Sequence, residues 1–149
     1  MESIESRSDT RTRLIDASPD QVFAAISDPV RIARWWGPDG FTNTIHTFEF
    51  FDGGRWVLTM HGPDGQDYPN ESHFVRIVPD KCVAIEHFSG HHFFLTLELA
   101  GQGQSTLLKW QQTFDTREHY ERIASFVANA NHQNLERLGV EVQRVISVV

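Results

Sequence analysis

The chain has 149 residues, 40% hydrophobic and 22% charged, which is the composition of one globular domain rather than of a disordered segment. The formal net charge of −7 argues against a nucleic-acid surface and against an anionic membrane surface, because both require a basic face. The sequence has one cysteine, Cys82, no secretory signal and no apolar run near the roughly 18–20 residues of a membrane span, so it predicts a cytoplasmic protein without membrane insertion.

The N-terminal part of the chain predicts one strand followed by two short helices. Residues 1–8 are polar and lack periodicity, so we expect a tail before a strand over residues 10–17. A capping-box pattern at Ser18 and Gln21, with a proline at the first helical position, predicts the first helix. The dipeptide Asp28-Pro29 repeats the cap-plus-proline signal and predicts the second.

Six further strands are expected at hairpin spacing. Runs rich in β-branched and aromatic residues alternate here with turns that contain Gly, Pro and Asp. The expected strands cover residues 42–51, 55–61, 68–78, 82–88, 93–100 and 105–114. Because consecutive strands joined by short turns pair side by side in opposite directions, the sheet should be antiparallel.

The last expected element is a long helix, since apolar residues recur at helical spacing after residue 115. We expect Asp115 to cap this helix, with Glu118 completing a capping box, and Gly139 to end it. Residues 140–149 are then a second tail, and the domain covers residues 9–139.

This order of elements predicts an α+β fold in which a curved, seven-stranded antiparallel sheet wraps around the C-terminal helix. A sheet curved around one helix leaves space between the two layers, and that space is the natural site for a small molecule. Alternation along the strands predicts which side chains face it. The expected ligand-binding residues are Trp35, His46, Phe48, Trp56, Leu58, Met60, His87, Phe93, Leu95, Trp110, Gln112, Phe126, Ala130, Asn131 and Asn134.

Apolar alternation alone does not separate a ligand wall from an ordinary core, because any half-buried sheet shows it. The polar residues of this set are more informative than the apolar ones. They are His46, His87, Gln112, Asn131 and Asn134. A buried polar group without a partner costs roughly 1–3 kcal/mol, so each of them requires a protein partner, a water molecule or a ligand.

Several kinds of chemistry are excluded by the motifs. The sequence contains no G-x-S-x-G motif, no Walker loop and no dinucleotide fingerprint. Its eight histidines show no zinc spacing, so we expect neither a metal nor a cofactor. His46 and His87 are the candidate catalytic residues, because histidine titrates in the range that acid–base catalysis requires.

A set of short motifs resembles one known family. The motifs are Ala17-x-Pro19-x-x-Val22-Phe23-x-Ala25, Trp35-Trp36-x-Pro38, Gly53-Gly54-x-Trp56, Met60-x-Gly62-Pro63-Asp64-Gly65 and Ile77-x-Pro79. Over about residues 10–138 the chain resembles the activator of heat-shock protein 90 ATPase homologue family, within the START and birch-pollen-allergen-like (SRPBCC) superfamily. The resemblance implies a helix-grip fold with a hydrophobic cavity between the sheet and the C-terminal helix.

One position departs from the family pattern. Relatives commonly carry Gly-Trp on the last helix, where this chain has Ala130-Asn131. If that Trp fills part of the cavity in the relatives, the cavity here is larger and its wall more polar.

Three functions are open at this point. We expect first a non-catalytic protein, monomeric or homodimeric, that binds a hydrophobic or aromatic small molecule. The second alternative is a cyclase- or hydrolase-like enzyme acting in the same cavity. The third is an interaction module for a chaperone ATPase. The acidic character of a stand-alone domain argues against this third function.

Overall fold

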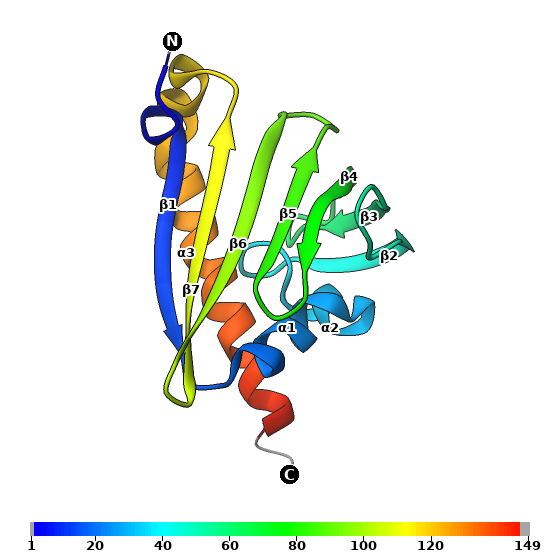
Figure 1. The fold of residues 1–149 in the computed structure, drawn as a ribbon. Coiled ribbons are helices and arrows are strands. Elements are labelled where there is room, and N and C mark those ends of the chain that lie inside the picture. Colours follow the sequence, from blue (N-terminus) through cyan, green and yellow to red (C-terminus); the bar gives the residue numbers. More distant parts are fainter. Residues whose placement is uncertain (1, 147–149) are drawn as a thin grey trace.

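A seven-stranded antiparallel sheet and one long helix make up most of the computed structural model, which describes residues 2–146 (Figure 1). The elements in chain order are a 3-10 turn at Glu5–Arg7, β1 (Ser8–Ile15), α1 (Pro19–Ser27), α2 (Pro29–Trp35), β2 (Thr42–Phe48), β3 (Arg55–His61), β4 (Asp67–Val78), β5 (Cys82–His87), β6 (Phe93–Gln102), β7 (Ser105–Phe114) and α3 (Arg117–Ile146). This architecture confirms the predicted helix-grip fold, with two short helices after the first strand.

The sheet order is β1-β7-β6-β5-β4-β3-β2, so the first strand pairs with the last and the remaining neighbours are consecutive hairpins. In Figure 1, β2 and β3 run across the direction of β1 and β7, which shows how strongly the sheet bends. The long helix α3 crosses behind β1 and β7, and α1 and α2 lie near its C-terminal half. Within residues 2–146, no helix combines the length and the apolar character needed to cross a membrane.

The capping signals before α1 and α2 are confirmed. The Gln21 side chain accepts a hydrogen bond from the backbone N–H of Ser18 at 3.0 Å. The Asp28 carboxylate accepts one from the backbone N–H of Val30 at 2.8 Å. These side chains satisfy N–H groups that the first turn of a helix leaves without intrahelical partners.

The predicted cap of the long helix was wrong by one residue. The hydroxyl of Thr116, rather than Asp115, accepts the hydrogen bond from the backbone N–H of His119 at 3.1 Å. The Asp115 carboxylate instead lies 2.7 Å from Nδ1 of His92. Asp115 and Thr116 could both cap a helix by residue type, and in the structure Asp115 makes a tertiary contact while Thr116 makes the cap.

The predicted end of the long helix at Gly139 was also wrong. The helix α3 continues to Ile146, so residues 140–146 are not a tail, and the expected tail residues 147–149 lie outside the described residues. A glycine inside a helix costs about 1 kcal/mol relative to alanine. Burial of Leu138 and Val142 on either side of it stabilises the continuous helix. At the other end, Ser8 of the expected tail begins β1.

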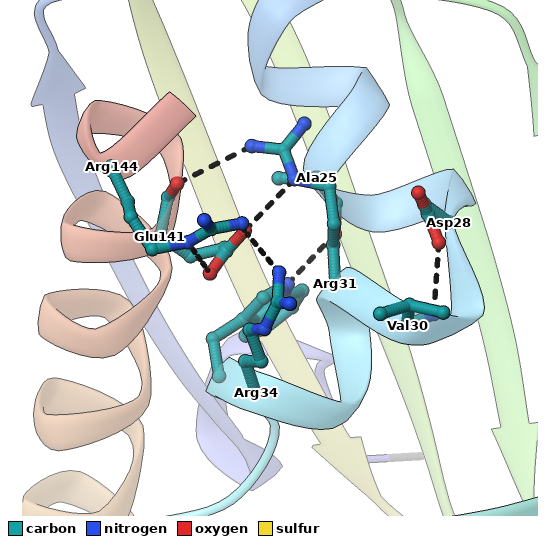
Figure 2. Close-up of polar contacts among 8 residues, drawn as sticks. Ala25, Asp28, Val30, Arg31, Arg34, Glu141 and Arg144 are labelled. Carbon is teal, nitrogen blue, oxygen red and sulfur yellow. Dashed lines mark hydrogen bonds and ion pairs between the residues drawn. The ribbon is translucent and has the colours of Figure 1, made fainter. Parts of the chain in front are cut away.

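An arginine cluster fixes the last turns of α3 against α2 (Figure 2). The buried Glu141 carboxylate accepts hydrogen bonds from Nε of Arg31 at 2.9 Å and from Nη2 of Arg144 at 2.9 Å. The guanidinium of Arg34 lies 3.7 Å from the same carboxylate. One buried anion is therefore shared by three cations, and it joins two elements that are far apart in the sequence.

Candidate functional site

A pocket of about 380 Å³ lies between α3 and the sheet. This volume falls in the range of small-molecule sites, which measure about 300–1,000 Å³. Twelve of the fifteen expected residues line it, and they come from four strands and from α3. These residues are Trp56, Leu58, Met60, His87, Phe93, Leu95, Trp110, Gln112, Phe126, Ala130, Asn131 and Asn134.

Strand register explains why these residues meet. Trp56 pairs across the strands with Ser72, Ser72 pairs with His87, and His87 pairs with Phe93. Directly opposed residues in an antiparallel sheet point to the same face, so this row forms one continuous wall. The alternation seen in the sequence therefore becomes a surface that spans β3 to β6.

A polar cluster interrupts this wall at its β4–β5 side. Nδ1 of His87 lies 2.7 Å from the backbone oxygen of His91, and Nε2 lies 2.7 Å from Oδ1 of Asn70 and 3.3 Å from the Ser89 hydroxyl. The imidazole ring also stacks on Phe93, with ring centroids 4.4 Å apart. Burial lowers the pKa of His87 below its usual value, although the bond to the His91 carbonyl opposes this. Burial thus disfavours the charged form of the ring.

A second polar network surrounds Asn131 on the opposite side of the pocket. The Asn131 amide donates hydrogen bonds to Asp9 Oδ2 and to Gln112 Oε1, both at 2.9 Å. Asp9 in turn forms a bidentate pair with Arg11, at 2.8 and 3.0 Å. The departure from the family pattern at this position thus ties α3 to β1 and β7 through a polar network.

The neighbouring Asn134 has a different set of partners. Its Oδ1 accepts a hydrogen bond from the backbone N–H of Gly37 at 3.2 Å, and its Nδ2 donates to the backbone oxygen of Trp35 at 2.9 Å. This amide therefore holds the segment after α2 against α3, which positions one edge of the pocket.

His46 does not lie where alternation predicted it. A β-bulge between Ile45 and Thr47 leaves His46 as the extra residue, because Ile45 pairs with Leu58 and Thr47 with Val57. The exposed ring of His46 contacts the hydroxyl of Thr59 at 2.8 Å instead of the pocket. One inserted residue reverses the inward and outward faces of a strand, and the sequence pattern gave no sign of it.

Phe48 and Trp35 also lie outside the pocket wall. The ring of Phe48 packs against Phe74 and Trp56, at centroid distances of 5.4 and 5.9 Å. Trp35 is 1% exposed, and its indole N–H donates to the backbone oxygen of Ala25 at 2.8 Å. Trp35 is therefore a core residue, and its neighbour Trp36 lines the pocket in its place.

Sequence reasoning missed eleven lining residues. They are Trp36, Gly37, Pro38, Tyr68, Pro69, Asn70, Ser72, Ser89, Gly90, His91 and Val127. Tyr68, Asn70 and Ser72 could have been found, since they alternate along β4 and pair with Met60, Leu58 and Trp56. The loop residues carry no comparable signal, because loop conformation has no fixed period.

The site offers limited catalytic chemistry. His87 is the remaining histidine candidate, and its hydrogen-bond partners are a carbonyl, an amide and a hydroxyl rather than a carboxylate. An acid–base histidine is usually oriented by a carboxylate in a dyad or triad. Among residues 2–146, no group of three His, Cys, Asp or Glu side chains is arranged to hold a metal ion.

Comparisons with known proteins agree with this fold. A family model described as Activator of Hsp90 ATPase homolog 1-like protein matches residues 16–143. A protein from Nitrosomonas europaea has a similar structure, with a TM-score of 0.87 at 12% identity over 95% of this chain and 97% of that chain. A protein from Arthrobacter aurescens gives 0.86 at 22% identity over 97% and 90%. No curated protein matches the sequence.

Proposed function

This chain belongs to the family of Activator of Hsp90 ATPase homolog 1-like proteins, and we propose that it binds a hydrophobic or aromatic small molecule without transforming it. The observation that carries the proposal is the pocket of about 380 Å³ between α3 and the sheet. Its wall is mainly apolar and includes the three indoles of Trp36, Trp56 and Trp110. An apolar concave site with a few polar groups is the usual anatomy of a small-molecule pocket.

The partners of the pocket histidine favour binding over catalysis. Both ring nitrogens of His87 lie within hydrogen-bond distance of protein groups, so the ring has little freedom to exchange a proton with a bound molecule. The other candidate, His46, is exposed and faces away from the pocket. A binding protein needs neither residue to titrate.

Fluorescence of N-phenyl-1-naphthylamine, an uncharged dye that brightens in apolar surroundings, tests the proposal. Titration with the protein should give saturable, one-to-one enhancement. The variant Ala130→Phe places a ring in the pocket and should weaken binding at least about tenfold, because the lost apolar contact area is worth more than 1.4 kcal/mol. The control is Asn129→Phe, an exposed position one residue earlier on α3.

Absence of saturable enhancement in the unmodified protein would contradict the proposal. So would equal loss of binding in the Ala130→Phe and Asn129→Phe variants, because the dye would then not occupy the pocket. Native mass spectrometry of freshly purified protein, followed by extraction, identifies any molecule that co-purifies. Turnover of that molecule by the purified protein would favour the enzyme alternative.

A further inference from the structure

The pocket wall lacks charged side chains. None of its 23 lining residues, all within the described part of the chain, is Asp, Glu, Lys or Arg. The whole chain nevertheless has 20 acidic and 13 basic residues. The titratable lining residues are Tyr68, His87 and His91.

Two groups that could supply charge near the wall, Asp9 and His87, are held by contacts within the protein. Asp9 lies behind Asn131 and is held by the Arg11 guanidinium in a bidentate pair. His87 is buried against Phe93, and burial lowers its pKa, which disfavours a positive charge on the ring. A charged group brought into this pocket would lose its hydration and find no counter-ion.

Several polar groups of the wall lack a hydrogen-bond partner among residues 2–146. The indole nitrogens of Trp56 and Trp110 are two of them, but both are closed off from the pocket space. Ser72 is 4% exposed and lines the pocket, and its hydroxyl makes no hydrogen bond to any residue from 2 to 146. It pairs across the strands with Trp56 on one side and His87 on the other. A buried hydroxyl without a partner favours a bound group that can donate or accept a hydrogen bond.

We propose that the pocket selects an uncharged ligand, with an aromatic or alicyclic skeleton and one neutral hydrogen-bonding group that meets the Ser72 hydroxyl. This inference rests on the proposed function and narrows it to a ligand class. Hydroxyl, carbonyl and amide groups satisfy the polar requirement. Carboxylates, sulfonates and ammonium groups do not, because the wall offers them no opposite charge.

Three naphthalene compounds of nearly equal shape separate charge from size. 2-Naphthamide is neutral, 2-naphthoate is an anion and 2-naphthamidinium is a cation, and all three bear a planar group at the same ring position. Isothermal titration calorimetry at neutral pH should show the amide binding at least about tenfold more tightly than either ion, because an ion must be desolvated without a partner. The cation is an essential comparison, since tryptophan faces attract cations.

The outcomes distinguish the inference from the function on which it rests. If either ion binds as tightly as the amide, the inference is overturned while the proposed function stands. If none of the three compounds binds although N-phenyl-1-naphthylamine does, the inference is overturned. If the dye also fails to bind, the proposed function itself is overturned.

The variant Ser72→Ala tests the assignment of the polar end. It should weaken 2-naphthamide binding about fivefold, as expected for one lost hydrogen bond. Binding of 2-ethylnaphthalene, which has no polar group, should not change. The matched control is Ser105→Ala on β7, outside the pocket, which should affect neither compound. Equal affinity of the Ser72→Ala variant and the unmodified protein for 2-naphthamide, with both melting normally, would overturn the role of Ser72.

Discussion

At the residue scale, Asn131 shows how one side chain links the pocket to the stability of the fold. It lines the pocket, is 6% exposed and donates to both Asp9 and Gln112. The family resemblance indicated that a polar residue stands here where relatives commonly have a tryptophan. It could not show that the amide is already paired, because its partners lie 122 and 19 residues away.

Substitution of Asn131 should separate these two roles. Asn131→Trp should weaken dye binding at least about tenfold by filling pocket space, and should lower the free energy of unfolding by about 1–3 kcal/mol because buried Asp9 loses a donor. Asn131→Ala removes the same donor without filling the pocket, so it should cost similar stability and retain dye binding. Chemical denaturation and dye titration measure both effects. A Trp variant that binds the dye normally would show that residue 131 does not limit the pocket.

At the element scale, two contacts hold the first and the last turns of α3 against the rest of the fold. His92 lies between Glu86 and Asp115, at 2.7 Å from each carboxylate, and so joins the β5–β6 hairpin to the segment before α3. Glu141 joins the last turns of α3 to α2. Propensity correctly predicted that a helix follows β7, but these tertiary contacts, which hold its start and its last turns, have no local sequence signature.

The His92 contact should make stability depend on pH. Hydrogen bonds to Glu86 and then to Asp115 raise the pKa of His92 above its usual value of 6.5. Its contribution is therefore fully present below pH 6.5 and is lost as the pH rises through the folded-state pKa. The variant His92→Gln should be less stable than the unmodified protein at low pH, by up to about 1 kcal/mol for such a partly exposed pair. This difference in the free energy of unfolding should shrink at higher pH. Denaturation curves of the two proteins that remain equally far apart at every pH would contradict the prediction.

Loss of the Glu141 carboxylate should destabilise the protein strongly. The variant Glu141→Gln leaves three guanidinium groups facing one another, with Arg31 well buried and Arg34 and Arg144 about half exposed. We expect a loss of about 2 kcal/mol, below the range for fully buried pairs. The control Glu136→Gln removes an exposed pair with Arg13 on the same helix and should cost less than about 1 kcal/mol.

The Glu141 effect should also depend on pH. Burial alone would raise the pKa of Glu141, but hydrogen bonds from Arg144 and Arg31 outweigh it, and the net shift is below the usual 4.5. The stabilisation is then present above pH 4.5 and is lost as the pH falls through the lowered pKa. The stability difference between the unmodified protein and Glu141→Gln should therefore diminish in acid. A difference that grows in acid would contradict this assignment.

At the scale of the whole molecule, the sequence predicted the fold more completely than it predicted the pocket. Turns and apolar alternation repeat over the whole chain, so one misplaced strand end does not change the sheet order. The pocket depends on single residues, and one bulge at His46 was enough to remove a predicted member. Its loop residues, such as Trp36 and Gly90, depend on tertiary contacts that no local pattern encodes.

Ligand binding should stabilise the whole domain, because the pocket is formed only when α3 packs on the sheet. A ligand that binds the folded state alone, at one hundred times its dissociation constant, adds about 2.7 kcal/mol to the free energy of unfolding. N-phenyl-1-naphthylamine should therefore raise the melting temperature of the unmodified protein and of Asn129→Phe, but not of Ala130→Phe. Hydrogen exchange should slow most in the lining segment 126–134 of α3 and in residues 87–93. An equal shift in the Ala130→Phe variant would show that the dye stabilises the protein from another site.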